Sequence, residues 1–190
     1  MIIAGLDEVG KGSLFGPVFA AAVILNKESE LYLIKTGLKD SKKLSTKKRT
    51  LLEPIIKKVA IGWSVGQASA REIDFLGIRL ATEKAMIRAV HRLTLQPSYL
   101  LIDGKLPLRL WEGMQESLIK GEDKSPSIAA ASVIAKVSRD SLIKRLAVKY
   151  PNYGLDTNVG YGTNFHRKQL IYLGASDLHR KTFLSKIQTA

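Results

Sequence analysis

The chain of 190 residues contains no cysteine, which excludes a disulfide framework and any thiol or Cys-based zinc chemistry. Long apolar runs are also missing, because the longest, residues 18–25 and 128–135, are too short to span a bilayer. The chain reaches its first acid at Asp7 without a basic leader, so we expect no signal peptide. We therefore expect a cytoplasmic, monomeric protein with no membrane partner.

Acidic residues are in short supply, with 17 Asp and Glu against 30 Lys and Arg, a net charge of +13. Such an excess favours a polyanionic partner, because each neutralised phosphate releases condensed counterions. A basic protein without a specific partner fits the charge equally well. The chain is 45% hydrophobic and 25% charged. We expect one folded domain, residues 1–190, whose last ~40 residues form a helical extension.

Apolar patterning indicates the elements. Strands are expected at residues 2–6, 18–25, 60–68, 99–102 and 118–119, with the first two close enough to form a hairpin. Helices are expected at residues 46–59, where Ser45 and Thr46 can cap and Pro54 interrupts, at 78–93 and at 127–149. Residues 26–44 and 152–164 are expected to be irregular, before one or two closing helices. This order predicts α/β or α+β structure around a central sheet.

Acidic residues follow three of the apolar runs. Asp7 and Glu8 come after the first run, Asp103 after the fourth, and Glu122 and Asp123 after the fifth. If the strands before Asp7 and Asp103 are neighbours, their carboxylates converge and repel one another unless cations are bound. Mg²⁺ or Mn²⁺ would suit such oxygen ligands. Each acid taken singly is more often a turn residue or a helix cap, so a metal site depends on convergence.

Several motifs resemble one known family. The segment Asp7-Glu8-Val9-Gly10-Lys11-Gly12 resembles the opening of ribonuclease HII, the bacterial type 2 ribonuclease H, and Gly16-Pro17-Val18 resembles the segment that follows it. Further blocks occur in family order across nearly the whole chain, at residues 38–45, 102–104, 120–122, 127–132, 135–140 and 160–163, with His166 after the last. One short motif is weak evidence, but this ordered series is strong.

The resemblance implies a fold and an activity. The fold is an α/β, ribonuclease H-like fold, with a mixed five-stranded sheet flanked by helices and extra C-terminal helices. The activity is endonucleolytic hydrolysis of the RNA strand of RNA/DNA hybrids and nicking 5′ of single ribonucleotides embedded in duplex DNA. Two divalent ions, Mn²⁺ or Mg²⁺, would serve the reaction, which leaves 5′-phosphate and 3′-hydroxyl ends. The implied partner is an RNA/DNA hybrid or ribonucleotide-containing DNA.

The resemblance also assigns the acids. Asp7, Glu8 and Asp103 match the family's catalytic, metal-binding residues. The fourth is usually the Asp of a Lys-Gly-Asp triplet, whose place is taken here by Glu122, with Asp123 as the alternative. Because Glu reaches one methylene further than Asp, we expect the metal spacing or metal preference to differ from that of relatives.

Residues expected to bind substrate are assigned in the same way. In the family, the loop that matches Gly10, Lys11 and Gly12 senses the ribose 2′-hydroxyl largely through its backbone, and glycine allows such close approach. Lys11 replaces the family's Arg, so it keeps the charge and loses the planar fork. We therefore expect ribose selectivity with weaker binding.

Three further residues lie outside this loop. Tyr161 matches the tyrosine that packs on the sugar at the RNA–DNA junction. Lys42 and Lys43 are implied phosphate contacts, although a solvated pair of charges is the ordinary reading of two such lysines. His166 is expected to support its loop by hydrogen bonding, with a helper role near the site as the alternative.

Three alternatives accompany this interpretation. One is another ribonuclease H-like nuclease or resolvase acting on branched DNA, which junction substrates would distinguish. Another is a non-catalytic nucleic-acid-binding protein, whose activity Asp7→Asn would leave untouched. Ribonuclease HIII is also related, but it carries an N-terminal domain before its first acidic pair, and Asp7 leads us to expect no such domain here.

Overall fold

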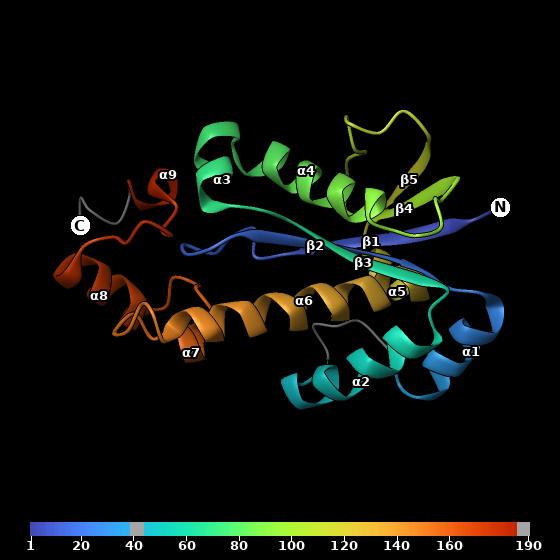
Figure 1. Cartoon of the computed structure of the whole chain (residues 1–190), viewed down its shortest axis with the longest axis horizontal. Helices are drawn as coiled ribbons and strands as arrows, with labels where there is room; N and C mark the ends of the chain where they lie inside the picture. The colour runs from blue at the N-terminus through green and yellow to red at the C-terminus, as the bar shows by residue number, and fades with distance from the viewer. Residues whose placement is uncertain (39–43, 186–190) are drawn as a thin grey trace.

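The protein is built around a five-stranded sheet in the order β3-β2-β1-β4-β5 (Figure 1). The computed structural model describes residues 1–38 and 44–185. The strands are β1 (Ile3–Val9), β2 (Val18–Ile24), β3 (Gly62–Ala68), β4 (Tyr99–Asp103) and β5 (Met114–Leu118). The first three pair antiparallel, as the expected hairpin requires, and β4 runs parallel to both β1 and β5. The sheet is therefore mixed, as expected.

Helices cover both faces of the sheet (Figure 1). One face carries α3 (Ala70–Leu76) and α4 (Ile78–His91), and the other carries α1 (Lys27–Lys35), α2 (Thr46–Val59) and α6 (Pro126–Ala147). The short α5 (Gly121–Lys124) leads into α6. The last part of the described chain forms α7 (Leu155–Asn158), α8 (Asn164–Leu173) and α9 (Lys181–Leu184). The α/β fold with flanking helices and C-terminal helices is thus confirmed.

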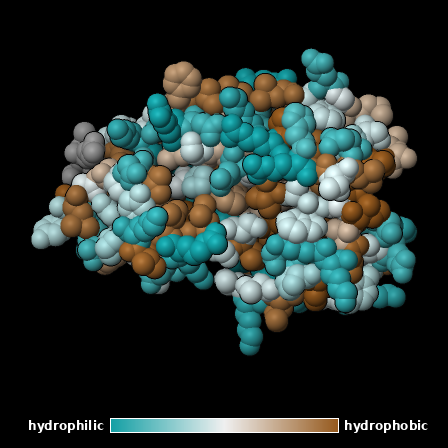
Figure 2. Space-filling view, in the orientation of Figure 1, coloured by the Kyte–Doolittle hydropathy of each residue, from teal (hydrophilic) through white to brown (hydrophobic). Residues whose placement is uncertain are grey.

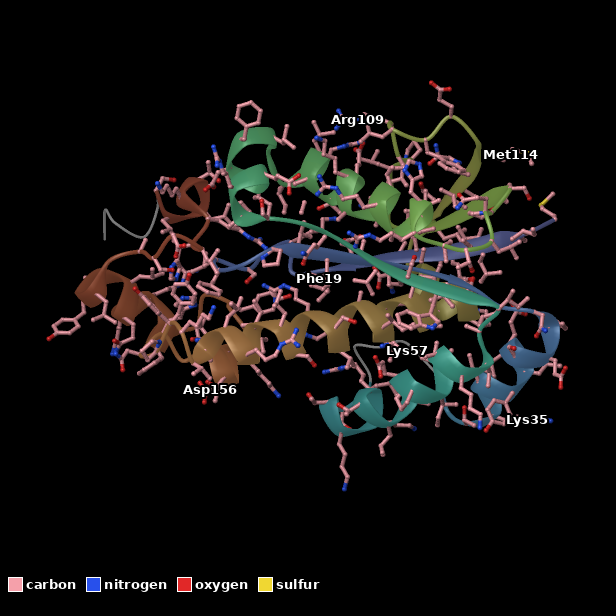
Figure 3. The ribbon with its side chains drawn as sticks, in the orientation of Figure 1. Phe19, Lys35, Lys57, Arg109, Met114 and Asp156 are labelled. Carbon is pink, nitrogen blue, oxygen red and sulfur yellow. The ribbon has the colours of Figure 1, made fainter. Side chains whose placement is uncertain are left out.

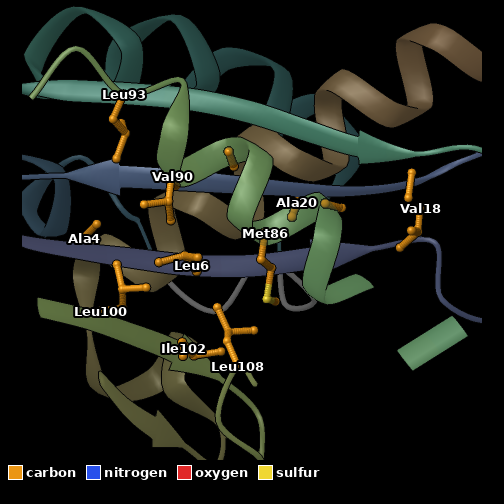
Figure 4. Close-up of a cluster of buried hydrophobic side chains, with 14 of the residues drawn as sticks. Ala4, Leu6, Val18, Ala20, Met86, Val90, Leu93, Leu100, Ile102 and Leu108 are labelled. Atoms are coloured by element: carbon orange, nitrogen blue, oxygen red, sulfur yellow. The ribbon is translucent and has the colours of Figure 1, made fainter. Parts of the chain in front are cut away.

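The side chains of β1 alternate between the two faces. Ala4 and Leu6 face α4, where Leu6 joins Met86 and Ile102 in a buried cluster (Figure 4). Gly5 and Asp7 face α6 instead. On that face a run of alanines in α6 packs against β2, and small side chains let the helix lie close to the sheet. On the face seen in Figure 2, hydrophilic side chains are interspersed with hydrophobic ones.

Local capping explains where two predicted helices begin. The Ser45 side chain accepts a hydrogen bond from the Lys48 amide at the start of α2, which contains Pro54 and ends at Val59 as expected. Ser125 caps α6 in the same way, and Pro126 occupies the first turn, where a missing N–H costs nothing. In the described part of the chain, no helix is long and apolar enough to cross a membrane.

Four sequence-based expectations were wrong. Residues 152–164 were expected to be irregular, but α7 forms there with Leu155 and Asn158 buried. The fifth strand was expected at residues 118–119, whereas pairing with β4 places β5 at Met114–Leu118.

Residues 26–44 were expected to be irregular, but α1 forms there because Asn26 caps it and Leu33 is buried against the core. The first strand was expected to end at Leu6, whereas β1 continues to Val9. Backbone pairing with β2, and not apolarity, sets that end, so Asp7 and Glu8 are strand residues.

Candidate functional site

Asp7 and Asp103 lie at the same level on neighbouring strands of the sheet. Strands β1 and β4 are parallel neighbours whose last paired residues are Leu6 and Ile102. The next residue on each strand is therefore an aspartate at the same level of the sheet. The charge of Asp103 also acts on Asp7. The topology thus brings two acids that are 96 positions apart in the sequence into one place.

Asp7 is a buried acid, with a side chain held by hydrogen bonds. Its residue is only 6% exposed, and its Oδ1 accepts the backbone N–H of Glu8 at 2.7 Å. Burial, followed by repulsion from Glu8 and Asp103, raises the pKa of Asp7 well above its usual range, although a hydrogen bond from Ser132 opposes the shift. The ionised carboxylate is therefore costly here unless a cation lies nearby.

Glu8 lies on the opposite side of β1 from Asp7. Its Oε1 lies 2.9 Å from the Lys11 ammonium, and it lines a cleft together with Asp103 and residues of α4. The loop after β4 forms one wall of this cleft. Arg109, in the same loop (Figure 3), donates to the buried Glu83 of α4 at 3.0 Å. This ion pair fixes the cleft wall to the helix.

Glu122 and Asp123 occupy different environments. Glu122 is 7% exposed, and the Ser132 hydroxyl donates to its Oε2 at 3.3 Å. Asp123 is exposed. Because Ser132 also bonds to Asp7, one α6 hydroxyl connects Asp7 with Glu122. Sequence reasoning gave Ser132 no role, since a serine in an alanine-rich helix carries no signal of its neighbours.

The four buried or partly buried carboxylates have the hard oxygen donors that a divalent cation prefers. In residues 1–38 and 44–185, no three acidic or histidine side chains are close enough to hold a metal ion as they stand. Each acid is instead engaged by the protein, for example Asp103, whose Oδ1 accepts the Gly121 N–H at 2.7 Å. The chemistry of this donor set, four carboxylates, suits a divalent cation.

The segment Gly10–Lys11–Gly12, termed here the glycine loop, follows β1. Gly10 has φ +87°, and a Cβ at this position would lie 2.2 Å from Nε of Arg139. Gly10 is therefore needed for its conformation and for the packing of Arg139, a reason that the sequence did not indicate. A Cβ on Gly12 would meet nothing within 4 Å, so its surface is open to a ligand.

Arg139 joins the segment after the glycine loop to the segment before Tyr161. Its fully buried guanidinium donates to the Val159 carbonyl at 2.9 Å, to Ser13 Oγ at 2.7 Å, and to two other carbonyls, those of Phe15 and Pro17. The Arg139 guanidinium also lies 5.5 Å from the centre of the Tyr161 ring. The sequence placed Arg139 in a family block without this role.

Two buried histidines are linked to the backbone of Tyr161 by hydrogen bonds. His166 Nδ1 lies 2.9 Å from the Tyr161 carbonyl oxygen, which confirms that His166 supports this loop. His166 Nε2 lies 3.0 Å from Nε2 of His179, a residue that the sequence left unassigned. Burial, followed by the charge of His166, lowers the pKa of His179 to about 4. Burial also lowers the pKa of His166.

This shift predicts acid sensitivity. The folded protein keeps His179 neutral down to pH about 4, whereas the unfolded chain binds a proton near 6.5. The free energy of unfolding should therefore fall as the pH drops between these values, by up to roughly 3 kcal/mol from this residue. Urea titrations at pH 7, 6 and 5 measure it. His179→Gln should flatten the slope, and exposed His91→Gln should not; equal slopes in all three proteins would contradict the prediction.

Lys42 and Lys43, expected to contact phosphate, lie outside the described residues. Of the other expected residues, Glu8, Lys11 and Asp103 line the cleft.

Comparison with known proteins adds independent evidence. The family model for Ribonuclease HII matches residues 4–186. A ribonuclease HII from Prochlorococcus marinus is 68% identical over 185 residues, which cover 97% of each chain.

Two solved structures share the fold. The ribonuclease H2 of Pyrococcus horikoshii OT3 aligns with a TM-score of 0.83 and 25% identity, over 100% of this chain and 98% of that one. The ribonuclease HII of Archaeoglobus fulgidus, solved in a complex with PCNA, aligns with a TM-score of 0.80 and 30% identity, over 95% and 94%. The chain belongs to the ribonuclease HII family and is a ribonuclease H enzyme.

Proposed function

We propose that this ribonuclease H hydrolyses the RNA strand of RNA/DNA hybrids and nicks duplex DNA 5′ of single embedded ribonucleotides. The products carry 5′-phosphate and 3′-hydroxyl ends. The observation that carries the proposal is the buried Asp7 carboxyl, held beside Asp103 and Glu8 and joined to Glu122 through Ser132. A cluster of acids this costly is expected where cations are bound during function.

We assign each acid a role in metal binding from its position. Asp7 and Asp103, at the same level on neighbouring strands, would anchor two Mg²⁺ or Mn²⁺ ions, and Glu8 and Glu122 would complete their coordination. Such a pair of ions activates a water and stabilises the leaving oxygen of a phosphodiester. Ser132 holds Asp7 and Glu122 in their present orientation, and Lys11 neutralises Glu8 at 2.9 Å.

We assign selection of the ribose to the glycine loop and Tyr161. The open backbone at Gly12 allows a sugar to approach, and Lys11, which also lines the cleft, can meet a phosphate. Tyr161, half-buried above Arg139, presents a ring on which a sugar can pack. The net charge of +13 would attract the duplex without reading its sequence.

The direct test is a nicking assay on a duplex with one embedded ribonucleotide. We expect one nick, on its 5′ side, in Mg²⁺ or Mn²⁺ and none in EDTA. An all-DNA duplex and a branched DNA junction serve as controls. A folded protein that cuts the junction and spares the ribonucleotide would overturn the proposal.

The neighbouring acids Glu122 and Asp123 form a matched pair. Glu122→Gln should reduce nicking by about a hundredfold or more, because it removes one buried anionic ligand. Asp123→Asn should change the rate less than about twofold, since the exposed side chain lies outside the cluster. Rates under single-turnover conditions measure both, and the reverse order would transfer the role to Asp123.

A further inference from the structure

Resting on the proposed function, we infer that the dipeptide His179-Arg180 positions the two parts of the ribose-reading site relative to each other. Arg180 holds the glycine loop, and His179, acting through His166, holds Tyr161. Neither residue of the dipeptide is exposed by more than 1%, so both act through other groups. The dipeptide thereby determines selectivity for a sugar that carries a 2′-hydroxyl.

The Arg180 contacts are to backbone oxygens. Its Nη1 donates to the Lys11 carbonyl at 2.9 Å, and its Nε donates to the Gly16 carbonyl at 2.9 Å. These bonds connect one side chain to the middle residue of the glycine loop and to Gly16, four residues after the loop. A guanidinium presents these donors on separate nitrogens in a fixed planar fork, whereas an ammonium presents its three donors from one atom on a flexible stem.

The hydrogen bonds that link His179, His166 and the Tyr161 carbonyl can run in only one donor-to-acceptor direction. The Ser176 backbone N–H donates to His179 Nδ1 at 2.9 Å, so this nitrogen carries no proton. The His179 proton therefore lies on Nε2 and points to His166 Nε2, 3.0 Å away. His166 must accept there, and its own proton lies on Nδ1, which donates to the Tyr161 carbonyl at 2.9 Å. The relay runs from residue 176 to Tyr161 with both rings neutral.

Both contacts start from adjacent residues of one rigid segment. Phe15 and His179 form a β-bridge, and the Arg180 amide donates to the Leu14 carbonyl at 2.9 Å. The same stretch therefore fixes the distance between the Lys11 and Tyr161 carbonyls. Arg139 lies between the two loops and adds bonds to Ser13 and Val159 without contacting either of these carbonyls.

The tautomers can be measured directly. In ¹⁵N-edited NMR spectra of the whole protein near pH 7, we expect His179 as the Nε2–H tautomer and His166 as the Nδ1–H tautomer. The opposite assignment, or a charged ring at either position, would overturn the relay. This measurement needs no substrate and is independent of nicking.

Asparagine and glutamine substitutions test the function of the relay. Gln resembles histidine at Nε2 and Asn at Nδ1, so His179→Gln keeps the donor to His166 and His179→Asn loses it. At position 166 the order reverses, because His166→Asn keeps the donor to Tyr161 and His166→Gln loses it. The readout is the affinity for a single-ribonucleotide duplex relative to its all-DNA counterpart, measured in EDTA.

We expect this selectivity ratio to fall about tenfold in His179→Asn and His166→Gln, the effect of roughly one hydrogen bond, and to stay within about twofold in the other two variants. Thermal unfolding should show that the Asn and Gln variants at each position lose similar amounts of stability. A ratio that follows stability, or no change in any variant, would overturn the positioning role. Loss of selectivity in His179→Asn and His166→Gln, but not in His179→Gln and His166→Asn, would support it.

Arg180→Lys tests the other contact in the same assay. It keeps the charge and loses one of the two carbonyl bonds, so selectivity should fall about tenfold while affinity for the all-DNA duplex stays within about twofold. An unchanged ratio would overturn the role of Arg180. A wild-type protein with no preference for the ribonucleotide would overturn the proposed function itself, whereas unaltered variants of a selective protein would overturn the positioning role alone.

Discussion

Asp7→Asn is expected to lower nicking by at least about a thousandfold and to make the folded protein more stable. Asn keeps an oxygen that can accept the Glu8 N–H now bonded to Asp7 Oδ1 at 2.7 Å. It removes the charge that burial and the neighbours Glu8 and Asp103 disfavour. Loss of activity with gain of stability is the signature of a residue kept for function and not for folding.

The sign of the stability effect follows from the raised pKa of Asp7. The unfolded chain loses this proton near its ordinary pKa, whereas the folded protein retains it to higher pH, so the cost of Asp7 grows as the pH rises above about 4. In EDTA at pH 7 to 8, the variant should have the higher free energy of unfolding. Near pH 4 the gain should vanish.

Urea titrations at several pH values and single-turnover nicking rates measure the two effects. Asp156→Asn, at an exposed position of α7 (Figure 3), is the control and should alter neither. Loss of activity accompanied by a pH-independent loss of stability would show that Asp7 serves the fold.

The sequence predicted those elements whose own residues set their limits. Ser45 caps α2, and apolar runs identified β1 to β4. The polar β5 was misplaced, because only Leu118 belongs to the short run expected there. It missed α1, since a single buried leucine, Leu33, in a polar segment leaves no clear period. The end of β1 was also misjudged, because pairing with β2 depends on a partner strand that local patterning does not describe.

The acids of the candidate site could be identified from motifs, but the residues that hold them could not. Ser132 and Arg139 are ordinary members of α6 until the fold brings them to Asp7 and Gly10. His179 and Arg180 lie in a polar turn with no helical or strand period. Such contacts join distant parts of the chain, and one sequence carries no signal of which parts meet.

Gly5→Ala is expected to have the largest effect on folding. A Cβ at Gly5 would lie 2.3 Å and 2.4 Å from backbone atoms of Ser127 and Ile128 at the start of α6. Backbone atoms in a packed helix cannot move aside as a flexible side chain can, so α6 must shift away from β1. We expect a loss of about 4 kcal/mol or more in free energy of unfolding.

The same displacement reaches the site, because Gly5 and Asp7 are successive residues on the face of β1 that packs against α6, and α6 carries Ser132. Where the variant still folds, nicking should fall with stability, unlike the result for Asp7→Asn. Gly62→Ala is the matched control, since its Cβ would make only ordinary contacts at 3.6 Å and 3.8 Å. Equal stability of these two glycine variants would show that α6 does not need this close approach, and that the Asp7–Ser132 contact is held by other means.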